Sequence, residues 1–108
     1  MKIRPREHAK FSADKMAKIA LATTGRAQLD LYCLEPGQAQ TPHTHPDQDK
    51  IYVVLEGRGR VLVGAEEELL EAGEAVVAPA GTPHGVSNPG PARLLALVVV
   101  SPPPRHGP

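Results

Sequence analysis

Glycine and proline interrupt this chain so often that short strands and turns are its most plausible building blocks. Ten glycines and twelve prolines occur among 108 residues, a share that favours a turn-rich β fold over a helical bundle. Hydrophobic residues make up 41% of the chain, which is enough for a core and too much for a disordered protein. The length is that of one domain. We therefore expect a single all-β domain.

Six segments have the composition and length of β-strands and end near glycine or proline. They lie at residues 27–34, 50–57, 60–64, 68–73, 74–81 and 92–100. Short strands at this spacing, with turn residues between them, predict a sandwich or barrel. Segment 50–57 is apolar on both faces, so we expect it to be central and covered on both sides. Residues 64–66 are expected to form a hairpin turn.

The two ends of the chain differ from its body. Residues 1–18 carry six Lys/Arg and two Asp/Glu, whereas residues 19–108 carry six and ten. We expect residues 1–26 to form a basic arm and an edge strand, with the arm lying across its own acidic barrel or that of a partner copy. Ser12 before "ADKMAKIA" predicts one short helical turn. Residues 27–100 would form the barrel, and 101–108 a proline-rich tail that cannot pair in a sheet.

Charge and cysteine content narrow the function classes. Twelve Lys/Arg balance twelve Asp/Glu, which argues against nucleic acid as a partner because phosphate binding needs a basic surplus. The single cysteine, Cys33, excludes an internal disulfide framework, is expected in the core, and fits the reducing cytoplasm. No apolar run approaches the roughly 20 residues of a membrane-spanning helix, and the first residues lack the apolar stretch of a signal peptide.

Three of the five histidines lie where metal chemistry is plausible. His43 and His45 are two residues apart, so on an extended segment both imidazoles face the same side and could reach one ion. His84 follows a later strand in "PAGTPHGVSN". Imidazole nitrogens suit zinc, iron, copper and nickel, and three such ligands leave positions open for water or substrate.

The residues that frame these histidines form two motifs. The first consists of Gly37, His43, His45 and Gly57, and the second of Gly73, Pro79, Gly81, His84 and Asn88. The pattern resembles the two motifs of the cupin superfamily. This resemblance implies a double-stranded β-helix, or jelly-roll barrel, with a metal in its mouth. The implied ligands are His43, His45, His84 and the glutamate of the first motif.

Lys50 stands at that glutamate position, seven residues before Gly57. Lysine offers no lone pair while protonated, and two unit charges 4 Å apart repel by roughly 4 kcal/mol at an effective dielectric constant near 20. Three outcomes are open. The ammonium reaches solvent and leaves a three-histidine site, it takes the place of the metal as a cation, or it loses its proton and acts as a base.

Neighbouring side chains could complete the site. Gln48 or Asp47 could supply a fourth oxygen ligand, whereas strand alternation would point Asp49 away from the face of Lys50. Tyr52 shares that face, so it could line the barrel and contact a ligand, or it could be a core aromatic residue.

Function hypotheses from different classes follow. The first is a protein that binds a divalent Zn, Fe, Ni, Mn or Cu ion and a small organic ligand in the barrel mouth. As an enzyme it would be of the dioxygenase, isomerase or decarboxylase type, with Lys50 or Tyr52 handling a proton. The second is a metal-free module that binds or senses a small anion through Lys50. The third gives the histidines a structural role, hydrogen-bonded to loop carbonyls. Since cupins of this length are commonly homodimers, a second copy is the expected protein partner.

Overall fold

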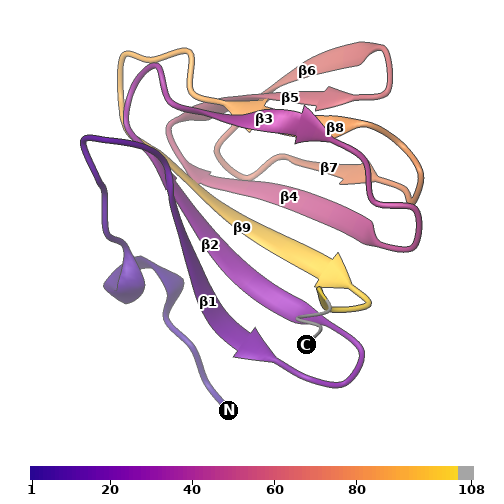
Figure 1. The fold of residues 1–108 in the computed structure, drawn as a ribbon. Helices are drawn as coiled ribbons and strands as arrows, with labels where there is room; N and C mark the ends of the chain where they lie inside the picture. Colours follow the sequence, from indigo (N-terminus) through magenta and orange to yellow (C-terminus); the bar gives the residue numbers. More distant parts are fainter. Residues whose placement is uncertain (105–108) are drawn as a thin grey trace.

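Two antiparallel sheets face one another in the computed structural model, which describes residues 1–104 (Figure 1). One sheet has five strands in the order β1-β2-β9-β4-β7, and the other has four in the order β3-β8-β5-β6. The elements are η1 (Pro5–His8), β1 (Ala17–Thr23), β2 (Gln28–Leu34), β3 (Ala39–His43), β4 (Asp49–Glu56), β5 (Arg58–Val63), β6 (Glu66–Glu71), β7 (Ala75–Ala78), β8 (His84–Ser87) and β9 (Leu94–Ser101). The all-β jelly-roll prediction is thus confirmed; the last four residues of the expected tail lie outside the described part.

All six predicted strands are present, as β2, β4, β5, β6, β7 and β9. The predicted hairpin joins β5 to β6 at Gly64. The strands β3 and β8 were not predicted from the sequence. Both are short, and β3 contains Pro42, which cannot donate a hydrogen bond to a neighbouring strand. These two strands carry the histidine motifs.

The strand covered on both faces is β2 rather than β4. β9 occupies the middle of the five-stranded sheet, and β4 lies between β9 and β7 with its outward side chains only half-buried. Leu31 and Cys33 of β2 are fully buried on the outer face, packed against Ala9 and Phe11 of the N-terminal arm. The prediction of complete coverage for segment 50–57 was therefore wrong, because the arm covers β2 instead.

The helical turn also lies elsewhere than predicted. The structure places a 3-10 turn at Pro5–His8, whereas the segment after Ser12 bends once and enters β1 at Ala17. Ser12 Oγ does accept a hydrogen bond from the backbone N–H of Asp14, at 3.3 Å. Pairing of β1 with β2 and packing of Ile19 on the outer cluster outweigh the local helix propensity, which is weak for so short a segment.

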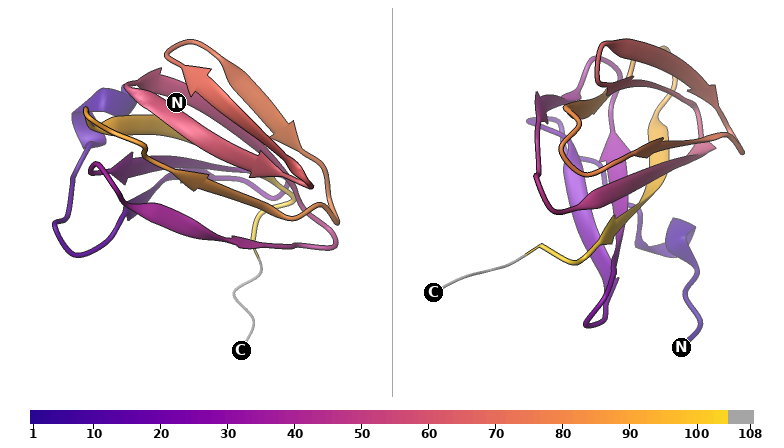
Figure 2. Two further views of the ribbon diagram at one scale, coloured as in Figure 1. Left: turned by 90° about the horizontal axis from the view of Figure 1, so that it is seen from above. Right: turned by 90° about the vertical axis from the view of Figure 1, so that its right-hand side faces the viewer.

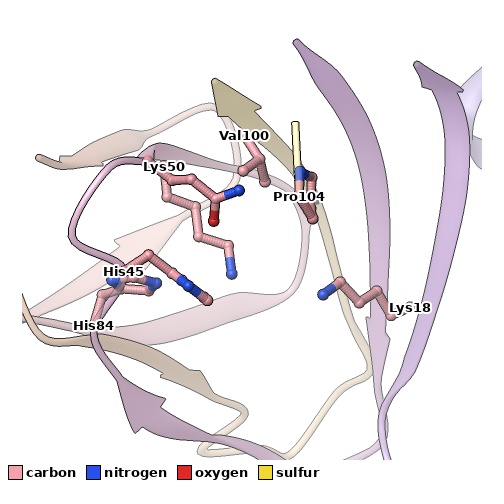
Figure 3. Close-up of a pocket in the computed structure, with 7 residues that line it drawn as sticks. Lys18, His45, Lys50, His84, Val100 and Pro104 are labelled. Carbon is pink, nitrogen blue, oxygen red and sulfur yellow. The ribbon is translucent and has the colours of Figure 1, made fainter. Parts of the chain in front are cut away.

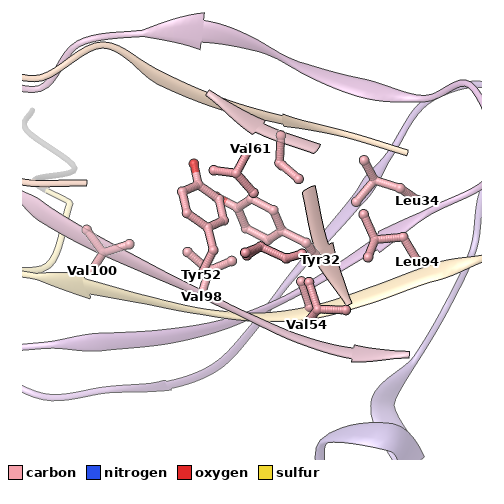
Figure 4. Close-up of a cluster of buried hydrophobic side chains, with 11 residues drawn as sticks. Tyr32, Leu34, Tyr52, Val54, Val61, Leu94, Val98 and Val100 are labelled. Atoms are coloured by element: carbon pink, nitrogen blue, oxygen red, sulfur yellow. The ribbon is translucent and has the colours of Figure 1, made fainter. Parts of the chain in front are cut away.

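Apolar side chains from both sheets meet in the interior (Figure 4). The cluster comprises Tyr32, Leu34, Tyr52, Val54, Val61, Leu70, Val86, Leu94, Ala96, Val98 and Val100. The rings of Tyr32 and Tyr52 pack edge to face, with their centroids 6.3 Å apart. This core fills one part of the sandwich and supports the polar side chains of the mouth.

The N-terminal arm lies on the outer side of the five-stranded sheet (Figure 2). Arg6 Nε donates to Glu56 Oε2 at 2.8 Å, and Arg6 Nη2 donates to the carbonyl of Leu55. The arm thus crosses its own barrel, one of the two predicted arrangements. Within residues 1–104, no helix has the length and apolar character required to cross a membrane.

Candidate metal centre

The pairing of β3 with β8 brings the two histidine motifs together. His43 and His84 are direct cross-strand partners, after a register shift between Gln40 and His43. Gly85 permits this approach: a Cβ atom there would lie 2.9 Å from the carbonyl oxygen of Gln40 and 3.1 Å from Cα of Pro42. The glycine beside His84 therefore allows β3 to come close enough for the two imidazoles to meet.

His45 completes a cluster of three imidazoles. It lies two residues beyond the end of β3, and its carbonyl accepts a hydrogen bond from the N–H of Gly81 at 2.8 Å. The ring centroid of His43 lies 4.6 Å from that of His45 and 4.5 Å from that of His84. One nitrogen from each ring can be chosen so that all three atoms lie within 4.8 Å of one another. Metal–nitrogen bonds of about 2 Å fit such a cluster.

Hydrogen bonds orient two of these rings. Nδ1 of His43 lies 3.0 Å from the carbonyl oxygen of Thr41, and Nδ1 of His84 lies 3.0 Å from that of Thr82. Since a carbonyl only accepts, Nδ1 carries the proton and Nε2 of the neutral ring keeps its lone pair. Nε2 of His84 is buried and has no partner among the described residues. A purely structural role would explain the Nδ1 contacts but would leave this buried nitrogen unsatisfied.

The surroundings favour the neutral form of His45 and His84. Burial lowers the pKa of His84 and that of His45, and the positive charge of Lys50 adds to both effects. A neutral imidazole is the form that binds a metal ion. The donor set and its protonation state therefore fit a divalent transition metal.

A cavity of about 90 Å³ opens beside the histidines (Figure 3). Its lining comprises Lys18, His45, Gln48, Lys50, His84, Val100 and Pro104. The histidines belong to β3, β8 and the loop after β3, whereas Lys18 and Lys50 belong to β1 and β4 of the opposite sheet. The site thus lies between the two sheets.

Lys50 does not reach solvent. Its side chain points into the cavity (Figure 3), and the residue is only 3% exposed. Its Nζ lies 5.3 Å from the ring centroid of Tyr32 and 5.6 Å from that of Tyr52. Burial, followed by the charge of Lys18, lowers the pKa of Lys50 to about 8, so the ammonium form predominates at neutral pH. The prediction that the ammonium reaches solvent was therefore wrong, because Nζ lies over two aromatic rings inside the barrel. The three-histidine cluster that this outcome also predicted is present.

The candidate oxygen ligands occupy different environments. Gln48 is 8% exposed and lines the cavity with His45 and His84. Asp47 is exposed. Asp49 is exposed and accepts a hydrogen bond from the N–H of Ala80 at 2.9 Å, on the opposite face of β4 from Lys50, as strand alternation predicted. Of these three residues, Gln48 lines this cavity, whereas Asp47 borders a neighbouring pocket with His45.

Tyr52 lies in the core beneath the site. Its hydroxyl donates to Oε1 of Gln40 at 3.2 Å, and Nε2 of Gln40 donates to the hydroxyl of Tyr32 at 3.2 Å. Burial raises the pKa of both tyrosines strongly, so their hydroxyls stay protonated. Tyr52 is absent from the cavity lining, and its ring centroid lies 6.4 Å from that of His84.

Sequence reasoning missed two charged residues on the inner face of the five-stranded sheet. Lys18 pairs with Tyr32 across β1 and β2, and its Nζ lies 5.6 Å from the ring centroid of Tyr32. Asp30 is fully buried; its Oδ1 accepts from Gln28 at 2.7 Å, and its Oδ2 has no partner among the described residues. The edge strand expected within residues 1–26 had no exact range, and the helical turn predicted after Ser12 covered Lys18, so the inward position of this lysine was missed.

Comparisons with known proteins agree with this geometry. The sequence profile of the cupin domain matches residues 30–100. The chain belongs to the cupin family. Among solved structures, TT1209 of Thermus thermophilus is 48% identical, with 96% of this cupin and 100% of TT1209 covered and a TM-score of 0.92.

Two curated relatives of this cupin come from Streptomyces. The uncharacterized protein SCO3923 of S. coelicolor is 33% identical over 97 residues, which cover 88% of this chain and 89% of SCO3923. The tetracenomycin polyketide synthase protein TcmJ of S. glaucescens is 41% identical over 64 residues, or 57% of this chain. That match spans only 43% of TcmJ.

Proposed function

We propose that this cupin binds a divalent transition metal through His43, His45 and His84, and that a small organic molecule binds beside the metal in the barrel mouth. Gln48 is the fourth ligand in this proposal. Zinc, iron, nickel, manganese and copper are the candidate ions, because each accepts imidazole or amide oxygen ligands.

One observation carries this proposal: Nε2 of His84 is buried without a partner among the described residues. It belongs to a cluster in which one nitrogen from each of the three histidines lies within 4.8 Å of the other two. An unsatisfied buried nitrogen costs about 1–3 kcal/mol, and a metal ion would satisfy it. The Nδ1 contacts to Thr41 and Thr82 support metal binding, because they direct the lone pairs of the other nitrogens away from those loops.

When bound, a divalent ion would act as a Lewis acid on an oxygen of the small organic molecule. The chain itself would supply Lys50 as a proton-handling group in the cavity, and Val100 and Pro104 as apolar lining. Tyr52 would support the site from the core, because its ring borders the ammonium of Lys50. If the protein is an enzyme, these groups suit the dioxygenase, isomerase or decarboxylase type predicted from the sequence.

Metal titration of the untagged protein tests the proposal. We expect one first-row ion per chain by elemental analysis, and loss of that ion in His84→Ala. Because His84 is buried and its removal could disturb folding, His45→Ala on the more accessible loop provides a second variant. His8→Ala, on the exposed 3-10 turn, is the matched control and should retain its metal. Wild-type protein that binds none of the five ions would contradict the proposal.

We also infer that two copies associate and that the protein works in the cytoplasm. The outer face of the five-stranded sheet is apolar, and the arm covers only part of it. Val77 on the edge strand β7 is 54% exposed, beside the half-buried Ile51 of β4. An exposed apolar edge favours association with another sheet. The single buried thiol of Cys33 suits a reducing compartment.

A further inference from the structure

The ammonium of Lys50 is buried and forms no ion pair within 4.0 Å among the described residues, although the charge of the buried Asp30 favours the protonated form. Although the residue is 3% exposed, the ion pairs of the described residues are Arg4–Glu7, Arg6–Glu56 and Arg93–Glu35, none of which includes it. Its contacts with the faces of Tyr32 and Tyr52 compensate only part of the desolvation cost of a cation. A buried cation that borders an open cavity is a group that an anion would stabilise.

A second cation points into the same cavity. Lys18 reaches it from β1, and Figure 3 shows both ammonium groups directed into the space in front of His45 and His84. The Nζ atoms of Lys18 and Lys50 lie 5.6 Å and 5.3 Å from the centroid of the same ring, that of Tyr32. The two lysines therefore converge from different strands, although the register of the sheet does not pair them with each other.

The cavity holds no negative charge of its own. The residues that line it, within residues 1–104, include two lysines, two histidines and one glutamine but no aspartate or glutamate. Asp30, the buried acid nearby, faces the interior but is not part of that lining. A divalent ion on three neutral imidazoles would keep its full charge and add to that of the lysines.

We propose that Lys18 and Lys50 form a carboxylate subsite, so that the ligand of this cupin is a small organic acid whose carboxylate lies between the two lysines and the histidine centre. This inference rests on the proposed metal function and deepens it. The first cupin motif, which this chain resembles, has a glutamate at the position of Lys50. Here the bound molecule would bring a carboxylate into a cavity whose own lining has none, and Lys50 would be its counterion.

The dimensions of the cavity restrict the ligand. A cavity of about 90 Å³ holds several water molecules, since each needs about 10–15 Å³ of such space, or one small organic acid. Lysine recognises a carboxylate as a compact point charge, and the histidine centre would take a neighbouring oxygen. Short hydroxy or oxo acids combine both features.

Calorimetric titration of the full-length, zinc-loaded protein tests the subsite. The probes are glycolate, a small hydroxy acid, and glycolamide, its neutral amide. We expect the wild type to bind glycolate at least tenfold more tightly than glycolamide, because a hydrogen bond to a charged group contributes more than one to a neutral group. Lys18→Met should weaken glycolate binding about tenfold, and Lys50→Met should remove the preference for the acid. Lys2→Met, an exposed lysine of the arm, is the matched control and should bind as the wild type does.

Zinc content measured on the same samples separates the two proposals. If the wild type holds zinc but binds both probes equally, or if Lys18→Met and Lys50→Met retain the preference for glycolate, the carboxylate subsite is refuted while the metal centre stands. If the wild type holds no zinc or other first-row ion, the metal centre is refuted, and the subsite that rests on it fails too. Retention of zinc in Lys50→Met would show that its loss of preference arises from the missing charge.

Discussion

His43 of β3 and His84 of β8 face each other as one antiparallel pair, although they are 41 positions apart in the sequence. Their ring centroids lie 4.5 Å apart, so the distance between the two motifs is set by the approach of two strands. The metal centre should therefore be sensitive to the backbone beside these histidines as well as to the imidazoles themselves.

Gly85→Ala should weaken the site without removing a ligand. The new Cβ would lie 2.9 Å from the carbonyl oxygen of Gln40, so β3 and β8 would have to separate. We expect a loss of about 1–3 kcal/mol in the free energy of unfolding, measured with urea, and weaker zinc binding. Gly25→Ala is the control, because a Cβ there meets nothing within 4 Å. Equal zinc affinity in both variants would show that this close approach does not position the histidines.

Lys50→Met should stabilise the protein at neutral pH. The ordinary lysine pKa of 10.5 falls to about 8 in the folded state, so between these values the unfolded chain binds more protons. As the pH rises from 8 to 10.5, this group therefore increases the free energy of unfolding of the wild type by up to about 3 kcal/mol. The variant lacks this gain. Its advantage over the wild type in urea unfolding should therefore be large at pH 7.5 and smaller at pH 9.5, whereas a constant difference would contradict the buried-ammonium assignment.

The thiol of Cys33 should resist modification in the native protein. Burial raises its pKa, and the side chain lies beneath the arm on the outer face of β2. With a disulfide reagent at pH 8, we expect labelling at least about 100-fold slower than that of an exposed thiol, since it requires local opening. Ala72→Cys, in the exposed turn after β6, supplies the comparison thiol in a Cys33→Ala background. Similar rates for both thiols would mean that the arm does not cover β2 in solution.

Val77→Lys should dissociate the expected dimer into monomers. Val77 is exposed on the outer side of the edge strand β7, and a lysine in an apolar interface would be buried without a partner. Light scattering should give a dimer mass for the wild type and a monomer mass for the variant. Ala72→Lys adds the same charge on the turn before β7 and should remain dimeric. A monomeric wild type would refute the association.

The parts of this fold that the sequence predicted are those encoded locally. β2, β5 and β9 carry their own apolar patterns, and the two motifs that frame His43, His45 and His84 predicted that these three side chains converge. The segment after Ser12 was predicted to form a helical turn because a serine can cap one. Its actual course depends on the pairing of β1 with β2, a separate segment.

The charged part of the site depends on contacts between distant segments. Lys18 faces the cavity only because β1 pairs with β2, and Gln40 joins Tyr32 to Tyr52 only through the positions of β2, β3 and β4. Residue types alone carry no signal for such contacts. The position of Lys50 was predictable from motif spacing, but its burial against two rings was not.

The division of the site between the two sheets has a mechanical consequence. His43 and His84 belong to the four-stranded sheet, and Lys18 and Lys50 to the five-stranded sheet. Any molecule that contacts both groups would act as a cross-brace and oppose sliding of one layer over the other. Occupancy of the mouth would then stiffen the whole sandwich, and amide hydrogen exchange would slow in both layers together.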